Sequence, residues 1–416
     1  MMRLKSLSWL VGLLLIVGSP GPGAAAATMA PLIVVSIDGF RADYLDRNLS
    51  PNLAAIAREG VRAQAMRPAF PSITEPNHYT LMTGLYPDHH GIVDNTMIDP
   101  AMPGVAFGGP HGHGEDMDPR WWDEATPLWV TAERQGLKTA TSLWPGDDAV
   151  IHGVSPTYRQ PLPAPDHRSA PMGQQMDTVL GWLDLPPAQR PGLIRVHLDV
   201  VDFMGHVAGP DSPRVNTAIG QADAAIGRLV QGLRARGLYD RVNLVIVSDH
   251  GMAAIAGDRV IYLDDIIDLK FAVVPSFGAV AGVDPAPGHE RQIDAALLVP
   301  HDHMTCWRKS DIPAHLHYGT NRRVPAIVCL GQVGWSIVTR AQSTLYPYLL
   351  GNHGYDPAEP TMAAVFLAHG PAFRSGVVVP AFDNVDVYQL LARLMGLRPL
   401  ANDGSLTPLK PALARP

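Results

Sequence analysis

The chain has 416 residues, of which 46% are hydrophobic and 17% are charged, and its formal net charge is −7 at pH 7. This length exceeds that of a typical single core, so we expect either one large domain with an insertion or two domains. The acidic balance argues against a nucleic-acid scaffold, because a surface that follows phosphates needs a basic excess.

The N-terminus has the features of a secretory signal peptide. Arg3 and Lys5 precede a short apolar segment over residues 7–17, and the alanines at residues 24–27 offer an A-x-A cleavage site. We therefore predict a signal peptide over residues 1–27, a mature chain over residues 28–416, and export to the periplasm or out of the cell. An uncleaved anchor is the alternative. No later apolar run is long enough to span a bilayer, so we expect no stable membrane anchor in the mature protein.

Strand-like and helix-like segments alternate along the chain. Continuous apolar, β-prone runs predict strands buried on both faces over residues 31–38, 193–198, 242–247 and 363–367. Ser50 and Pro51 mark the start of a helix that ends before Gly60, and residues 211–237 repeat a helical apolar spacing. This alternation predicts an α/β fold in which a doubly wound sheet has helices on both faces.

The segment between His250 and His353 departs from this alternation. Prolines, aromatic residues and short β-like runs replace regular strands and helices, and we expect a smaller inserted subdomain at about residues 254–349. This segment contains both cysteines of the chain, Cys306 and Cys329. In an exported protein such a pair can form a disulfide, and the alternative is two free buried thiols.

Acidic and histidine side chains follow several predicted elements. In a doubly wound sheet, ligands bind beyond the carboxyl ends of the strands, and Asp38 and Asp249 with His250 are expected at such ends. Asp202 and His206 are four residues apart, so on a helix both would face the same side and could bind one metal ion.

Together these groups indicate a metal site, to which His353 adds an imidazole in a glycine-flanked turn. Asp and His without Cys suit zinc in a hydrolytic site, with manganese or iron as alternatives. The side chains outnumber the ligands of one tetrahedral ion. We therefore predict two zinc ions about 4 Å apart, which would bind the attacking and leaving oxygens of a phosphoryl transfer. The candidate ligands are Asp38, Asp202, His206, Asp249, His250 and His353.

Thr74 is the candidate nucleophile. It precedes Pro76 by two residues, which suits the first turn of a helix and would place its hydroxyl at the positive end of the helix dipole. Coordination to a metal ion would activate this weak nucleophile, whereas the alternative is an ordinary N-cap. Asn95 is a loop donor that can stabilise charge on phosphoryl oxygens or simply shape a turn. For His78 we expect packing or a local hydrogen bond.

The motifs of the chain resemble those of the nucleotide pyrophosphatase/phosphodiesterases, a family of the alkaline phosphatase superfamily. The resemblance runs from about Pro31 to Leu406, nearly the whole mature chain. Its carriers include, in chain order, VVSIDGFRADYL, FPSITEPNHYTLMTGLYPDHHGIVDN, DFMGHVAGP, SDHGM and GNHGYD. The resemblance implies an alkaline-phosphatase-like fold and hydrolysis of phosphodiester or pyrophosphate bonds.

The resemblance also implies a role for each matching residue. One zinc ion would be held by Asp202, His206 and His353. The other would be held by Asp38, Asp249 and His250, with Thr74 as a further ligand. Thr74 would attack phosphorus and form a phosphothreonine intermediate that water then hydrolyses. Asn95 and the backbone amide of Thr74 would bind a non-bridging oxygen.

Two positions depart from the pattern of the nucleotide-cleaving relatives. These relatives usually have an aromatic residue after the nucleophile and a Tyr five residues before the metal-binding Asp, where this chain has Glu75 and His197. Glu75 could attract a cationic head group or face solvent at the pocket rim. Other aromatic residues could supply a surface for the base instead, namely Trp121, Trp122, Trp144 and Tyr158.

Small-molecule nucleotides such as ATP, dinucleotides or nucleotide sugars are the leading substrate prediction. The same chemistry on choline- or lipid-derived phosphodiesters is the first alternative. A metal-binding protein that has lost catalysis is the second alternative, and the complete set of ligands and nucleophile argues against it. The sequence leaves the oligomeric state open.

Overall fold

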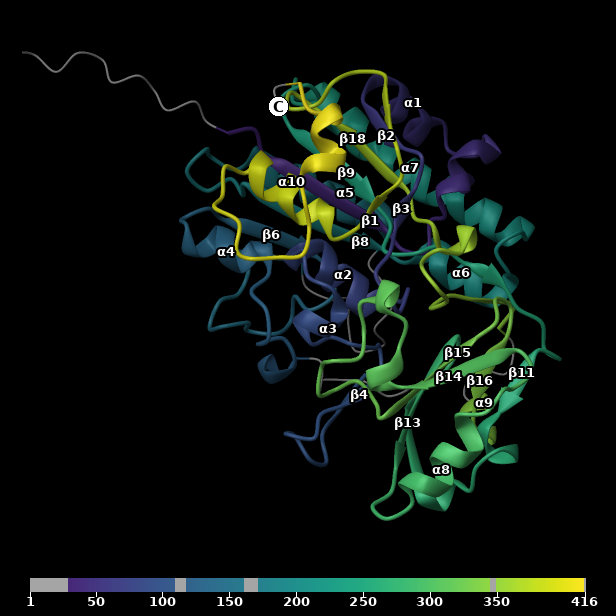
Figure 1. The fold of residues 1–416 in the computed structure, drawn as a ribbon. Helices are drawn as coiled ribbons and strands as arrows, with labels where there is room; N and C mark the ends of the chain where they lie inside the picture. Colours follow the sequence, from purple (N-terminus) through teal and green to yellow (C-terminus); the bar gives the residue numbers. More distant parts are fainter. Residues whose placement is uncertain (1–28, 109–116, 161–170, 345–348, 415–416) are drawn as a thin grey trace, which may run out of the picture.

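A computed structural model describes residues 29–108, 117–160, 171–344 and 349–414. The predicted signal peptide over residues 1–27 lies outside the described residues. The centre of the fold is an eight-stranded sheet with the order β19-β2-β18-β9-β1-β8-β6-β7 (Figure 1). In that order the strands span Val377–Val379, Val61–Ala63, Phe366–His369, Asn243–Val247, Leu32–Ile37, Leu193–Leu198, Thr139–Ser142 and Tyr158–Arg159.

The middle of this sheet is parallel. The strands β9, β1, β8, β6 and β7 run in one direction, whereas β18 pairs antiparallel with β9. All residues of β1 are buried, and successive side chains enter two different cores: Ile33 and Val35 lie in one, Leu32 and Val34 in the other. A strand covered on both faces needs such a continuous apolar run, which is the pattern at residues 31–38.

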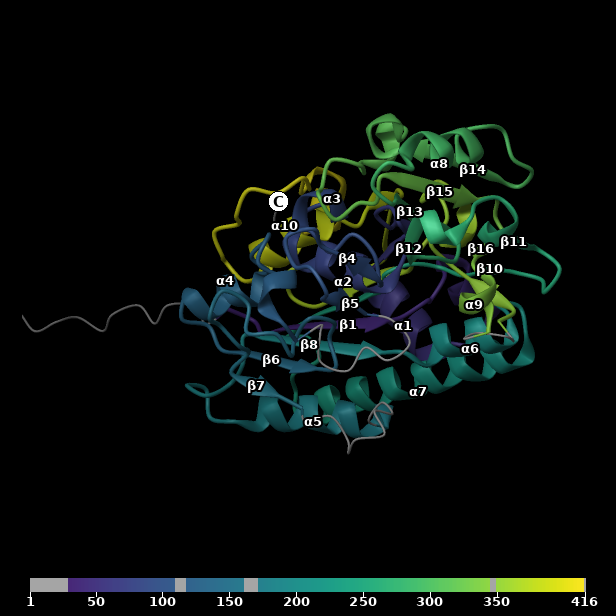
Figure 2. The same ribbon diagram turned by 90° about the horizontal axis from the view of Figure 1, so that it is seen from below.

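Helices cover both faces of the sheet, as Figure 2 shows, and this confirms the predicted α/β fold with a doubly wound sheet. One face carries α1, α5 and α7, which span Pro51–Glu59, Met172–Asp184 and Pro213–Ala235. The other face carries α2, α4 and α10, which span Thr74–Thr83, Leu128–Arg134 and Asp386–Leu394. The helices α3, α6 and α9 span Pro87–His90, Val200–Ala208 and Arg340–Ser343.

The start of α1 differs from the sequence prediction. Ser50 stands at the N-cap position, but its side chain makes no capping hydrogen bond. Instead, the Asp223 carboxylate on α7 accepts hydrogen bonds from the backbone amides of Asn52 and Leu53 at 3.2 and 2.8 Å. An acid from a neighbouring helix therefore satisfies the free amides, which no local sequence pattern could indicate.

The strand predicted at residues 363–367 is shifted toward the C-terminus. The structure forms β18 at Phe366–His369, and Ala364 makes isolated bridges to Arg41 and Met66 instead. The apolar run is thus shared between two pairings, so its composition alone does not fix the strand's first residue.

A second, antiparallel sheet lies beside the central one, within the segment predicted as an insertion (Figure 1). Its four strands have the order β12-β13-β15-β14 and span Ala272–Ser276, Val280–Pro285, Ile327–Gly331 and Met304–Arg308. With α8 at Glu290–Leu297, this sheet contributes to a separate hydrophobic core. The subdomain boundaries at about residues 254 and 349 stay a prediction.

Short two-stranded ladders complete the set of sheets among the described residues. The pairs are β3 with β20 (Met66–Arg67, Phe382–Asp383), β4 with β5 (Met97–Ile98, Ala106–Phe107), β10 with β17 (Ala253–Ala254, Gly351–Asn352) and β11 with β16 (Val260–Tyr262, Ser336–Val338). The last two pairs each join a segment between β9 and the second sheet to one that follows the second sheet in the chain.

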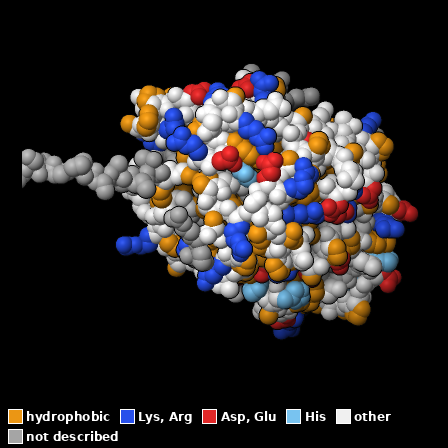
Figure 3. All heavy atoms as spheres, turned by 90° about the horizontal axis from the view of Figure 1, so that it is seen from above, with side chains coloured by type: hydrophobic (Ala, Val, Ile, Leu, Met, Phe, Trp, Pro, Cys, Tyr) orange, Lys and Arg blue, Asp and Glu red, His pale blue; other side chains and the backbone are white. Residues whose placement is uncertain are grey.

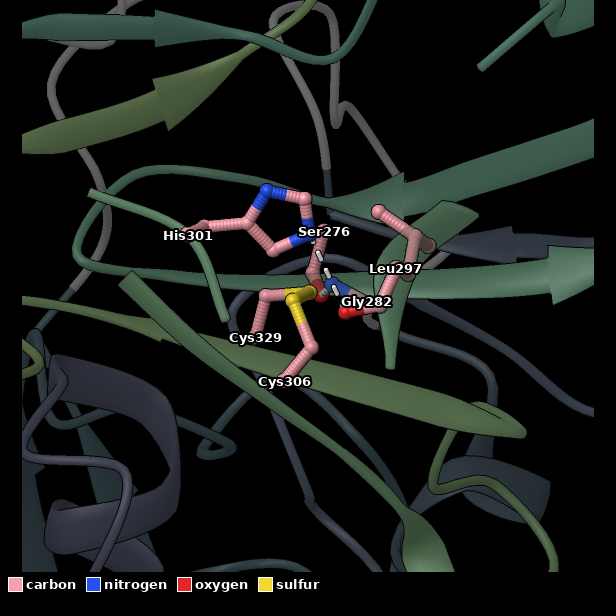
Figure 4. Close-up of a disulfide and its surroundings, with 6 residues drawn as sticks. All are labelled: Ser276, Gly282, Leu297, His301, Cys306 and Cys329. Atoms are coloured by element: carbon pink, nitrogen blue, oxygen red, sulfur yellow. Dashed lines mark hydrogen bonds between the residues drawn. A yellow bond between two sulfur atoms is a disulfide. The ribbon is translucent and has the colours of Figure 1, made fainter. Parts of the chain in front are cut away.

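Cys306 and Cys329 form a disulfide between β14 and β15 (Figure 4). The two residues are direct partners in the antiparallel pairing, and the bond joins positions 23 residues apart in the chain. Of the two alternatives left open by the sequence, the structure has the disulfide.

The surface drawn in Figure 3 is chemically mixed. Basic and acidic side chains lie among apolar and neutral ones on this face. Among the residues that the structure describes, no helix is both long enough and apolar enough to cross a bilayer.

Candidate active site

Three predicted site residues meet at the carboxyl ends of the parallel strands. Asp38 directly follows β1, and Asp249 and His250 lie just beyond β9, which pairs with β1. All three side chains are buried, and their ligand atoms lie within 4.8 Å of one another. We call these residues the Asp249 cluster.

A second group, which we call the Asp202 cluster, consists of Asp202, His206 and His353. Asp202 and His206 are one turn apart on α6, and His353 follows β17. Their ligand atoms also lie within 4.8 Å of one another. The rings of His250 and His353 stack with centroids 3.5 Å apart, so the two clusters adjoin. The structure thus brings all the predicted Asp and His ligands into one site.

Close backbone packing permits this convergence. Gly39 has a φ of 65°, and a Cβ atom at this position would lie 2.9 Å from the Cα atom of Asp202. A Cβ atom on Gly351 would lie 2.3 Å from the carbonyl oxygen of Gly205. A side chain at either position would separate α6 from the loop after β1 or from β17.

The imidazoles of the two clusters share one orientation. In each ring, Nδ1 faces a backbone carbonyl oxygen, which can only accept, so Nδ1 carries the proton and donates it. In the neutral ring Nε2 is then bare and available to a metal ion. The pairs are His206 with Gly351 at 2.9 Å, His250 with Gly251 at 2.8 Å, and His353 with Ser72 at 3.0 Å.

Several polar atoms in the site lack the partners that buried groups require, and this fits a bound cation. The bare Nε2 atoms of His206 and His353 face each other at 3.0 Å, and in the neutral rings neither can donate to the other. One carboxylate oxygen of each acid is buried without a hydrogen bond, namely Asp38 Oδ1, Asp202 Oδ1 and Asp249 Oδ2. Nitrogen and oxygen donors of this kind suit zinc.

The electrostatics of the site also favour a bound cation. Burial raises the pKa of Asp38 well above its usual range, and the neighbouring carboxylates of Asp249 and Asp202 raise it further. Burial disfavours the charged form of His250, but the Asp249 carboxylate outweighs burial and raises the pKa of His250. A divalent ion would supply the positive charge that keeps the crowded carboxylates ionised.

Thr74 is the first residue of α2, and Ile73 occupies the N-cap position, so Thr74 is not the N-cap. Thr74 Oγ1 lies 3.2 Å from His250 Nε2, which places the hydroxyl against the Asp249 cluster. Asn95 Oδ1 accepts a hydrogen bond from the backbone amide of Glu75 at 2.8 Å. Asn95 is therefore held beside the start of α2, where helix amides favour an anion.

Two further histidines contact this region. His78 Nδ1 donates to the Thr74 carbonyl oxygen and its Nε2 accepts from the Ser36 hydroxyl, both at 2.9 Å, which is the local role expected for it. Burial lowers the pKa of His78 to about 4, so the ring is neutral at pH 7. His197 Nε2 donates to Asp38 Oδ2 at 2.9 Å. Sequence reasoning missed this contact, which depends on the pairing of β1 with β8.

A cleft of about 710 Å³ opens beside the Asp202 cluster. His206 and His353 line it, and aromatic side chains line it as well, namely Phe203, Tyr262 and Phe277. Phe203 stands inside the DFMGH motif, directly after a predicted metal ligand. Its place next to a predicted metal ligand was the sequence signal that could have identified Phe203. Tyr262 and Phe277 are separated from the motifs in sequence, so no sequence signal marked them as part of the cleft.

The aromatic residues suggested from the sequence lie elsewhere. Trp121, Trp122 and Trp144 are buried in the hydrophobic core, so the prediction that they offer a surface for the base is wrong. Tyr158 packs against the opposite core and donates its hydroxyl to the Gln189 carbonyl oxygen. Tryptophan in a sequence does not distinguish a core position from a pocket, because either environment suits its large apolar ring.

The sheet, its helices and the paired acid–histidine clusters define an alkaline-phosphatase-like hydrolase. The chain belongs to the type I phosphodiesterase / nucleotide pyrophosphatase family, whose family model matches residues 32–356. This is a family of phosphodiester and pyrophosphate hydrolases.

Individual relatives match over most of the chain. An uncharacterized pyrophosphatase/phosphodiesterase of Schizosaccharomyces pombe is 36% identical over 404 residues, which are 94% of this chain and 82% of that protein. A bis(5′-adenosyl)-triphosphatase of Bos taurus is 35% identical over 386 residues, which are 92% of this chain and 82% of that protein. Among solved structures, murine ectonucleotide pyrophosphatase/phosphodiesterase 5, in an inactive form with a threonine-to-alanine substitution and in complex with AMP, has a TM-score of 0.87 and 35% identity. That match covers 92% of this chain and 100% of the murine one.

Proposed function

We propose that this protein is an exported hydrolase that uses two zinc ions to cleave phosphodiester or pyrophosphate bonds of nucleotides, with Thr74 as its nucleophile. The observation that carries the proposal is the position of the Thr74 hydroxyl, at the N-terminus of α2 and 3.2 Å from His250 Nε2. The adjoining Asp202 cluster supports a site for a second ion.

Each cluster would hold one ion. The ligands of one ion would be Asp202, His206 and His353. The ligands of the other would be Asp38, Asp249 and His250, with Thr74 Oγ1. When bound, the ions would supply the positive charge that lowers the pKa of the Thr74 hydroxyl and stabilises the charge on the phosphoryl oxygens.

The side chains of the site have distinct tasks in the proposed reaction. Thr74 Oγ1 forms a bond to phosphorus while the bond to the leaving oxygen breaks, which gives a phosphothreonine intermediate. Water then hydrolyses this intermediate and restores the hydroxyl. Asn95 is held at the start of α2 and lines the cleft, so its amide group would donate to a non-bridging oxygen together with the backbone amide of Thr74.

Relatives and sequence features support the proposed substrates and location. One relative is a bis(5′-adenosyl)-triphosphatase, and the murine relative was solved in complex with AMP. The murine protein also becomes inactive when a threonine is replaced by alanine. Export is proposed from the N-terminal sequence and supported by the Cys306–Cys329 disulfide, because such bonds persist mainly in oxidising compartments.

The nucleophile is tested by comparing Thr74→Ala with Thr74→Ser in the mature protein. We expect Thr74→Ala to retain its zinc but to lose about 10³-fold in kcat on the 4-nitrophenyl ester of thymidine 5′-phosphate, because no oxygen remains to attack phosphorus. Thr74→Ser keeps a hydroxyl and should retain more of the activity. Mass spectrometry after acid quenching should find phosphorylated Thr74 only when the hydroxyl is present. Near-normal turnover by Thr74→Ala would refute the assignment.

The substrate class is tested with the unaltered protein. We expect faster hydrolysis of the nucleotide ester than of 4-nitrophenyl phosphorylcholine, and much slower hydrolysis of 4-nitrophenyl phosphate. Preference for the choline ester would favour the alternative substrate class. Preference for the monoester would contradict the proposed diester chemistry, and no turnover by zinc-loaded protein would indicate a metal-binding protein without catalysis.

A further inference from the structure

The cleft of about 710 Å³ contacts one cluster and not the other. Its described lining includes His206 and His353 of the Asp202 cluster, but neither Thr74 nor any member of the Asp249 cluster. Asn95, which is held at the start of α2, also lines it. Ile73, the residue directly before Thr74, lines it as well, so the cleft extends from the Asp202 cluster to the residue that precedes the nucleophile.

This position relates the cleft to one part of the substrate. In an in-line displacement at phosphorus, the attacking and leaving oxygens lie on opposite sides of the phosphorus atom. Thr74 would attack from the side of the Asp249 cluster, because its hydroxyl contacts His250 at 3.2 Å. The leaving oxygen then points toward the Asp202 cluster, and the group attached to it enters the cleft.

The walls of the cleft are poorly suited to an anionic group. Among the lining residues that the structure describes, none is Lys or Arg, and Asp94 is the acid. Arg340 stacks on the Tyr262 ring at 4.4 Å, but its guanidinium is already paired with Asp265. Beyond the metal site, a pyrophosphate leaving group would find no cation on these walls to balance its charges.

Apolar side chains form much of the lining instead. Phe203, Tyr262 and Phe277 contribute aromatic rings, and Val207 and Val260 contribute aliphatic surface. Phe203 follows Asp202 on α6, and its side chain is 56% exposed. A flat apolar group that covers this ring would remove apolar surface from water on both sides of the contact.

We infer, building on the proposed function, that this cleft binds the leaving group and selects an uncharged aromatic or apolar alcohol over a phosphate-bearing one, with Phe203 as a specificity-determining residue. In the step concerned, the bond between Thr74 Oγ1 and phosphorus forms and the bond from phosphorus to the leaving oxygen breaks. The proton of the Thr74 hydroxyl passes to solvent, and the departing alkoxide takes up a proton from solvent, so the leaving group is released as the alcohol. The favoured substrates are then phosphodiesters of nucleotides rather than their pyrophosphates.

The test compares two substrates with the same thymidine 5′-phosphoryl group: the 4-nitrophenyl ester, whose leaving group is aromatic, and the triphosphate, whose leaving group is pyrophosphate. We expect Phe203→Ala to lower kcat/KM for the aryl ester about tenfold and to change that for the triphosphate less than about twofold. Val260→Lys, which adds a cation to the lining, should raise kcat/KM for the triphosphate about tenfold. Val273→Lys is the matched control. Its valine is 55% exposed on β12 and does not line the cleft, so neither substrate should respond.

The outcomes separate this inference from the proposed function. Suppose that the unaltered protein hydrolyses both substrates. If Phe203→Ala then lowers kcat/KM equally for both, or Val260→Lys leaves kcat/KM for the triphosphate unchanged, the cleft does not bind the leaving group. The inference is then overturned while the hydrolase proposal stands. If the zinc-loaded protein hydrolyses neither substrate, the proposed function fails and the inference fails with it.

Discussion

His197 acts on the site through another side chain. Its Nε2 donates to Asp38 Oδ2 at 2.9 Å, whereas Asp38 Oδ1 is buried without a hydrogen bond. The donor thus occupies one oxygen of the carboxylate and leaves the other for a cation. Partners of this kind orient metal ligands and raise metal affinity. The position that departs from the Tyr of nucleotide-cleaving relatives would therefore support the proposed metal site by orienting Asp38.

Replacement of His197 tests this positioning role. We predict that His197→Leu weakens zinc binding about 10- to 100-fold, because Asp38 loses the donor that orients it. His197→Gln can still donate from its amide group and should recover much of the affinity. Competition with a chromogenic chelator measures the zinc dissociation constants. Equal constants for all three proteins would show that His197 does not position Asp38.

At the residue scale, sequence motifs identify the candidate metal ligands better than they identify the groups that orient those ligands. Asp202 and His206 have a spacing that predicts one shared face of a helix, and α6 provides it. The carbonyl oxygens that accept from the imidazole Nδ1 atoms belong to Gly351, Gly251 and Ser72. Every residue has a backbone carbonyl group, so no residue type marks these contacts in advance.

At the element scale, α1 depends on a neighbouring helix for its N-terminal hydrogen bonds. Asp223 on α7 accepts from the amides of Asn52 and Leu53, and its side chain is buried. The carboxylate also lies at the positive end of the α1 dipole. One side chain thus joins two helices on the same face of the sheet.

Removal of this carboxylate should loosen the contact between the helices. We predict that Asp223→Ala lowers the free energy of unfolding by about 2 kcal/mol, because buried amides lose their acceptor. Asp223→Asn keeps an oxygen that can accept and should cost less. Urea denaturation followed by circular dichroism measures both changes. Unfolding midpoints that match the unaltered protein would contradict the proposed capping role.

The sequence predicts some helices and strands more clearly than others. The parallel strands β1, β8 and β9 need continuous apolar runs, which composition makes visible. Strand β12 contains Pro275 and an exposed Val273, and Ser276 is its one buried position, so it lacks such a run. It is an edge strand, where a proline is tolerated because one side needs no partner. The order of the second sheet could not be predicted for this reason.

At the scale of the whole molecule, the site joins distant parts of the chain. The clusters combine residues from the ends of β1 and β9, from α6 and from the segment after β17. The cleft adds side chains of the segment that contains the second sheet, such as Tyr262 and Phe277. Strand-end acids could be predicted to converge because parallel strands end at one edge. The lining of the cleft could not be predicted in this way, because it depends on how the second sheet packs against the main body.

The proposed reaction requires two ions, held by the two clusters beside Thr74. The most direct measurement is the metal content of purified, active protein by inductively coupled plasma mass spectrometry, alongside Asp202→Ala and Asp249→Ala. We predict two zinc ions per chain in the unaltered protein, about one in each variant, and loss of activity when a chelator removes them. A fully active protein that contains no bound transition metal would contradict the proposed two-ion mechanism.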